Sequence, residues 1–84
     1  MWLECNVLKE SGMRDMEVEI KLQDDSVTTI TVHPTIVGKI ENKSYVKVEY
    51  LAKMNNLTYI KLPRPSMQHG HNITVSSLKL KEIS

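Results

Sequence analysis

The sequence is poor in aromatic residues and in cysteine. It has one tryptophan, three tyrosines and no phenylalanine, so a core must rest on Val, Ile, Leu and Met side chains. Cys5 is the one cysteine, which excludes an intrachain disulfide. Because small secreted domains are usually held together by several disulfides, we expect a reducing, cytoplasmic compartment. Cys5 alternates with Leu3 and Val7, so we expect it in the core.

Long apolar runs and catalytic motifs are also missing. The first ten residues include Glu4 and Lys9, so we expect neither a signal peptide nor a membrane span. The chain has no phosphate-binding loop, dinucleotide fingerprint, serine nucleophile elbow or zinc-protease motif. We therefore expect a non-enzymatic protein with no cofactor and no membrane partner.

The chain has 84 residues, which predicts a single domain over 1–84. A domain of this size buries only roughly 60% of the surface that its unfolded chain exposes, so its stability margin is small. A core with few large aromatic side chains buries less apolar surface, so the expected free energy of unfolding is smaller still. This favours support from a second subunit, and hence a homodimer.

The net charge of +1 conceals an uneven distribution. Residues 1–32 hold seven acidic and three basic residues, whereas residues 33–84 hold eight basic and three acidic ones. All three histidines lie in the basic part. Such a division indicates an anionic partner. The alternative is that acidic and basic strands lie together in the fold and cancel each other.

Alternation with a period of two is the main pattern in the chain. It is clearest over 16–22, where Met16, Val18, Ile20 and Leu22 alternate with charged residues. In a strand these four side chains share one face and the charges lie in water, as in an antiparallel sheet with one solvated face. The expected strands, separated by turn residues, are 3–7, 16–22, 27–32, 36–41 with a bulge or bend at Gly38, 45–51, 57–62, 72–75 and 78–83.

This spacing predicts an all-β fold, a small antiparallel barrel or sandwich of SH3-like or Sm-like architecture. The least decided segment is 46–54. Val48, Leu51 and Ala52 also have helical spacing, and Glu49 and Lys53 form an i, i+4 pair. The alternative is therefore an α+β fold with one short helix there. The β-branched residues and tyrosines of the segment favour a strand.

Tyrosines and lysines alternate in two of the expected strands. Tyr45, Lys47, Tyr59 and Lys61 occupy the positions between the apolar ones. If the two strands pair, one solvated face presents two aromatic rings among positive charges. Bases stack on such rings while lysines neutralise phosphates, so the pattern predicts a nucleic-acid interface. Ordinary cross-strand packing of the tyrosines is the competing interpretation.

The segment 63–71 is the second candidate, because a loop of this length in a small domain is often functional. Arg64 lies between two prolines, which end the preceding strand and stiffen the segment. Its guanidinium can bind a phosphate or stack on a base. Gln68, His69 and His71 add hydrogen-bonding groups. Two histidines are too few ligands for zinc, so we expect no metal.

Two functions follow as hypotheses. The first is a cytoplasmic module that binds nucleic acid, with RNA favoured over duplex DNA because single strands are read by sheets and small barrels. The alternative is a protein-binding inhibitor or adaptor that docks by a sheet edge or by the long loop. Such a protein, of the accessory type found in phages and plasmids, neutralises a host or toxin protein, and it can do so in an RNA-dependent way.

Overall fold

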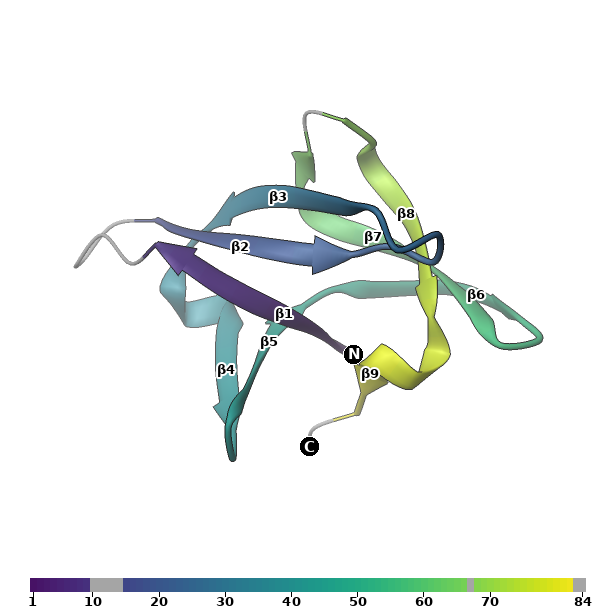
Figure 1. Ribbon diagram of the computed structural model, residues 1–84, viewed down its shortest axis with the longest axis horizontal. Helices are drawn as coiled ribbons and strands as arrows, with labels where there is room; N and C mark the ends of the chain where they lie inside the picture. The colour runs from purple at the N-terminus through teal and green to yellow at the C-terminus, as the bar shows by residue number, and fades with distance from the viewer. Residues whose placement is uncertain (10–14, 67, 83–84) are drawn as a thin grey trace.

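The computed structural model describes residues 1–9, 15–66 and 68–82 (Figure 1). These residues form nine strands and two short 3₁₀ turns, and no α-helix lies among them. The all-β expectation is therefore confirmed. The elements are β1 (Trp2–Lys9), β2 (Met16–Lys21), β3 (Val27–Val32), η1 (Pro34–Ile36), β4 (Val37–Ile40), β5 (Lys43–Lys47), β6 (Glu49–Met54), β7 (Leu57–Ser66), β8 (Gly70–Ser76), η2 (Ser77–Lys79) and β9 (Leu80–Lys81).

The strands form two antiparallel sheets, and over the described residues neither sheet closes into a barrel. The larger sheet has the order β3-β2-β1-β5-β4, with β9 also paired to β1. The first half of β1 pairs with β5 and with β9, and its second half pairs with β2. β1 therefore joins three neighbours at once. The smaller sheet has the order β6-β7-β8.

The core follows the alternation seen in the sequence. Met16, Val18, Ile20 and Leu22 are all buried, as their spacing predicts. Val18, Ile20 and Leu22 pack with buried aliphatic side chains of β1, β3, β5, β7 and β8. Cys5 belongs to the same cluster and is 6% exposed, which confirms its expected place in the core. β3 lies next to β7, and buried side chains of both sheets contribute to this one core.

The segment 45–51 is not one strand, and the helix considered for 46–54 is wrong. β5 ends at Lys47, and β6 begins at Glu49 in the other sheet. Val48, between them, is buried, and its backbone N–H donates to the carbonyl oxygen of Met1 at 2.9 Å. The chain thus changes sheets at a single residue that is fixed to the N-terminal end of the chain.

Three details of the expected strands need correction. Gly38 makes no bulge: it pairs regularly with Tyr45, and a Cβ there would lie 3.4 Å from the Trp2 ring. A Cβ at this distance would make an ordinary van der Waals contact with the indole. At the starts of two expected strands the chain forms 3₁₀ turns, so the expected strand 36–41 becomes the end of η1 followed by β4, and the expected strand from 78 onward becomes η2 followed by β9. Residue 83 of that expectation lies outside the described residues.

The prolines at 63 and 65 do not end β7, contrary to expectation. β7 continues to Ser66, although its pairing with β8 passes from Lys61 directly to Ser66. Proline lacks a backbone N–H, but the ladder is irregular over this stretch and loses no regular hydrogen bond there. Of the long loop expected over 63–71, the described residues up to Ser66 and from Gly70 onward are strand, and residue 67 lies outside the described residues. β8 starts at Gly70, whose φ is +65°.

In the described part of the chain, no helix is long and apolar enough to cross a membrane.

Candidate functional site

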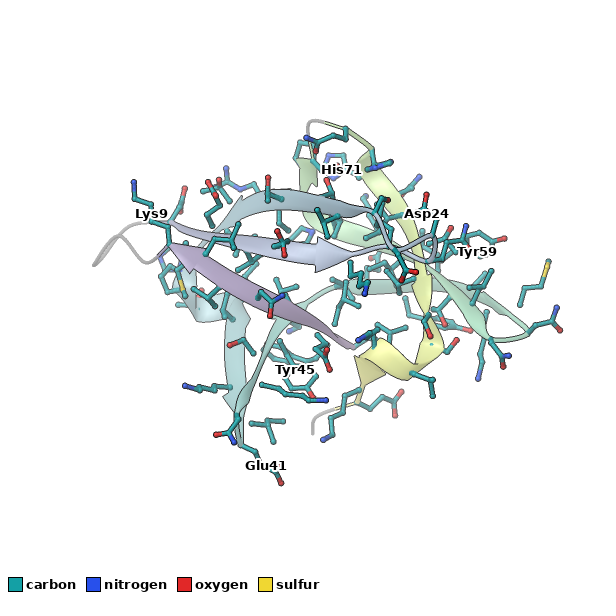
Figure 2. The ribbon with its side chains drawn as sticks, in the orientation of Figure 1. Lys9, Asp24, Glu41, Tyr45, Tyr59 and His71 are labelled. Atoms are coloured by element: carbon teal, nitrogen blue, oxygen red, sulfur yellow. The ribbon has the colours of Figure 1, made fainter. Side chains whose placement is uncertain are left out.

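The four alternating Tyr and Lys residues do not share one face, because their strands do not pair. β5 pairs with β1 and β4, whereas β7 pairs with β6 and β8. Tyr45 is 7% exposed, and the Lys81 ammonium lies 5.9 Å from its ring centroid. Figure 2 shows Tyr45 beside the β4–β5 hairpin and Tyr59 near the β6–β7 end of the molecule. Tyr45 is therefore a packed residue rather than part of an open face.

Two of the four residues, Tyr59 and Lys61, do share a face, which is the outer face of the smaller sheet. Tyr59 and Lys61 point away from the core, while Ile60 between them and Leu62 after them are buried. Tyr59 is 39% exposed and lies between Ala52 on β6 and Thr74 on β8. Small neighbours of this kind leave much of its ring accessible.

A groove of about 540 Å³ opens beside Lys61, where β5 passes into β6 alongside β7. Val48 and Leu62, both buried, and Pro63 give it an apolar floor. Charged and titratable side chains complete the lining, which comprises Lys47, Glu49, Lys61 and His71. The structure thus brings Lys47 and Lys61 together through the change of sheet at Val48, and His71 joins them from β8.

The imidazole of His71 has a fixed partner in this groove. Its Nδ1 lies 3.3 Å from the carbonyl oxygen of Leu62. A carbonyl oxygen only accepts hydrogen bonds, so Nδ1 carries a proton and donates it. Nε2 is then an acceptor in the neutral ring and a second donor in the imidazolium. One nitrogen orients the ring and the other is left for a ligand.

The charges of the groove are positive overall. Lys61 stands opposite Glu49 in the β6–β7 register, but over the described residues neither Lys47 nor Lys61 forms an ion pair. Other lysines of the basic segment behave differently, since Lys43 and Lys79 both pair with Glu4 on β1. Part of the positive charge of residues 33–84 is thus neutralised by ion pairs within the fold. No ion pair neutralises the ammonium groups of Lys47 and Lys61 in the described residues.

The remaining predicted residues lie outside the groove. The Gln68 side-chain oxygen accepts a hydrogen bond from the Thr28 hydroxyl on β3 at 2.9 Å. His69 lines a separate hollow of about 220 Å³ with Asp24 and residues of β8. Hydrogen bonds from the Ser26 hydroxyl and backbone N–H lower the pKa of Asp24, and the charge of His69 lowers it further. Arg64 is exposed on β7, just beyond Pro63.

The histidines do not assemble a metal centre in this part of the structure. Among residues 1–9, 15–66 and 68–82, no group of three or more His, Cys, Asp or Glu side chains is placed to hold a metal ion.

Sequence reasoning missed the residues that shape the groove. Val48, Leu62 and Pro63 were expected as ordinary strand or loop residues, and Glu49 was considered as an i, i+4 partner of Lys53. No local signal marks Val48 as the point where the chain leaves one sheet for the other, because Val46, Val48 and Tyr50 alternate with charged residues straight across that point. The groove depends on this long-range arrangement.

No protein-family model matches the chain, and it has no significant match among curated proteins or solved structures. The functional argument therefore rests on the residues and their geometry.

Proposed function

We propose that the protein binds single-stranded nucleic acid, RNA in preference to duplex DNA, on the outer face of β6–β7–β8 and in the adjoining groove. One observation carries the proposal. Lys47, Lys61 and His71 converge around an apolar floor, and the exposed ring of Tyr59 lies two residues from Lys61 on the same face of β7.

Each part of this surface has a role. Tyr59 provides a stacking surface for an unpaired base, which a duplex keeps within its own stack. Lys47 and Lys61 attract the phosphates next to that base. His71 Nε2, directed by the Leu62 contact, is a hydrogen-bonding group for a 2′-hydroxyl, the group that distinguishes RNA from DNA. Arg64 extends the positive surface along β7.

The predicted roles of Tyr45, Gln68 and His69 are weaker parts of this proposal. Tyr45 is buried in the larger sheet, and the Gln68 side chain is engaged by Thr28. His69 faces a different hollow. We therefore assign the binding surface to Tyr59, Lys61, Lys47, His71 and Arg64.

We also propose that the two sheets are the halves of an opened small barrel of SH3-like or Sm-like type. The contact between β3 and β7 and the three neighbours of β1 support this assignment. A cytoplasmic location belongs to the same proposal, because a lone buried thiol is typical of proteins in a reducing compartment.

Fluorescence anisotropy of a labelled single-stranded RNA, with duplex DNA alongside, tests the binding. We expect RNA binding that weakens as salt rises from a low to a physiological concentration. Tyr59→Ala should cost about 1–3 kcal/mol of binding free energy, as loss of a stacked base does elsewhere. Lys61→Ala should reduce the slope of affinity against salt by about one phosphate contact. Arg64→Ala should also weaken binding.

Two control variants match these substitutions. Tyr50→Ala removes a tyrosine of similar exposure whose register partner, Ile60, points to the opposite face of the sheet. Lys39→Ala removes an exposed lysine of β4 in the other sheet. Neither should weaken binding as Tyr59→Ala and Lys61→Ala do. Absence of RNA binding at low salt would refute the proposal and favour the protein-binding alternative.

A further inference from the structure

Among the described residues that line the groove, Glu49 is the one carboxylate. The other charged or titratable side chains there, Lys47, Lys61 and His71, are basic. Glu49 stands opposite Lys61 in the β6–β7 register, so the two side chains point to the same side of the sheet. A carboxylate repels phosphates, so it would weaken a groove that bound phosphates alone. Its position fits a ligand that carries hydrogen-bond donors as well as negative charge.

The carboxylate of Glu49 is free to accept hydrogen bonds. Over residues 1–9, 15–66 and 68–82, neither an ion pair nor a side-chain hydrogen bond engages it. Glu4 differs, because lysines hold both of its carboxylate oxygens. An ionised carboxylate accepts hydrogen bonds through both oxygens and donates none. Glu49 therefore presents paired acceptors at the groove, and Lys61 presents donors across the strand pair from them.

Guanine has the Watson–Crick edge that matches these two residues. Its O6 accepts a hydrogen bond, and the adjacent N1–H and N2 amino group both donate. The neighbouring donors fit the two oxygens of a carboxylate, and O6 fits an ammonium, as it does when lysine reads guanine in DNA. On the same edge of adenine, cytosine or uracil, each donor lies beside an acceptor, so none of these bases offers two neighbouring donors.

The rest of the groove suits a planar base. Val48 and Leu62 are buried and lie with Pro63 in the floor, which gives an apolar surface for the face of the base. Lys47 remains for the phosphate. Tyr59 lies two residues before Lys61 on the same side of β7, so the next base of the strand can stack on its ring.

We propose that the groove selects guanine, with Glu49 accepting hydrogen bonds from N1–H and the N2 amino group while Lys61 donates to O6. Glu49 is thereby the residue that sets base specificity. The ammonium of Lys61 has enough donors for both O6 and a neighbouring phosphate. Guanine selection rests on the proposed binding of single-stranded RNA, and it adds the base that such an RNA contains. An unpaired guanine exposes this edge and a paired one does not, which favours single strands.

Fluorescence anisotropy with labelled uridine strands of about ten nucleotides, which differ at one central base, tests the selection. The central base is guanine, adenine or hypoxanthine, all of which are purines that stack. Hypoxanthine is guanine without the N2 amino group. We expect the guanine strand to bind at least about fivefold more tightly than the adenine strand, the lower end of discrimination by paired hydrogen bonds, with the hypoxanthine strand between them.

Glu49→Gln replaces one acceptor oxygen by an amino group that donates. The preference for guanine over adenine should fall below about twofold. The adenine strand should bind at least as tightly as it binds to the wild type, because the phosphates lose a negative neighbour. Glu41→Gln is the matched control. It removes the same charge from an exposed side chain in the β4–β5 turn, away from Tyr59 (Figure 2), and should leave the preference unchanged.

Two results would overturn guanine selection while RNA binding stands. One is equal binding of the guanine and adenine strands by the wild type, and the other is a preference that survives Glu49→Gln. A variant that weakens every strand equally would also overturn it, since that loss is structural rather than specific. If the wild type binds none of the strands at low salt, the proposed RNA binding falls, and guanine selection falls with it.

Discussion

The ammonium of Lys79 lies 3.2 Å from Oε2 of Glu4, and so ties the end of η2 to the first strand of the chain. Lys43 approaches the other carboxylate oxygen of Glu4 at 3.3 Å from the start of β5. One carboxylate thus holds two segments that are remote in sequence. Burial alone would raise the pKa of Glu4, but the hydrogen bonds from Lys79 and Lys43 outweigh it, so the pKa lies below its ordinary value of 4.5.

Glu4→Gln should lower the free energy of unfolding at neutral pH by about 1 kcal/mol, because the contact is partly solvated. The pKa of Glu4 is lower in the native state than in the unfolded chain. Its contribution is therefore complete above pH 4.5 and disappears as the pH falls through the lower native pKa. Urea unfolding at several pH values measures this. Glu17→Gln, at an exposed position of β2, is the control, and equal losses in both variants would contradict the assigned role.

Gln68 should matter for stability whatever its role in binding. Its side-chain oxygen is a hydrogen-bond partner of the Thr28 hydroxyl, and Thr28 is buried. Gln68→Ala removes that partner, and the expected loss in unfolding free energy is about 1–2 kcal/mol. In a Thr28→Val background the same substitution should cost less, since no hydroxyl remains to be satisfied. A double-mutant cycle measures the difference, and equal costs in both backgrounds would contradict this account.

Cys5 should be unreactive in the native protein. Burial first, and then the charge of Glu4, raise the pKa of its thiol to about 11. At pH 8 the thiol is therefore protonated as well as buried, and the reactive thiolate is scarce. Labelling with a thiol reagent should be much slower than for the urea-unfolded chain and should follow the opening of β1. If the native protein were labelled as fast as the unfolded chain, Cys5 would not be buried by the pairing of β1 as described.

Local patterns were enough for much of the fold. The alternation over 16–22 predicted β2 and its buried face, because a strand with one wet side requires that period. It did not locate the break between β5 and β6, since Val46, Val48 and Tyr50 alternate without interruption across a change of sheet. The strand end expected at Pro63 and Pro65 was wrong for a related reason. The two prolines were expected to end a regular ladder, and the ladder is irregular where they lie.

The site was predictable in its residue types but not in its assembly. Tyr59 and Lys61 were expected on an open face, and they share one. Tyr45 was expected there too, but it is packed inside the larger sheet, where Lys81 of β9 approaches its ring. Contacts between segments far apart in the sequence leave no local signal. Lys47 reaches Lys61 because the chain crosses at Val48, not because their strands pair.

Because the chain changes sheets at Val48, the two lysines of the groove belong to different sheets. Lys47 ends a strand of one sheet, and Lys61 lies within a strand of the other. The distance between the two ammonium groups therefore depends on how the two sheets are oriented where the chain passes between them at Val48. A polyanion bound as proposed would link the two sheets through these lysines, so its binding should raise the stability of the contact between the sheets.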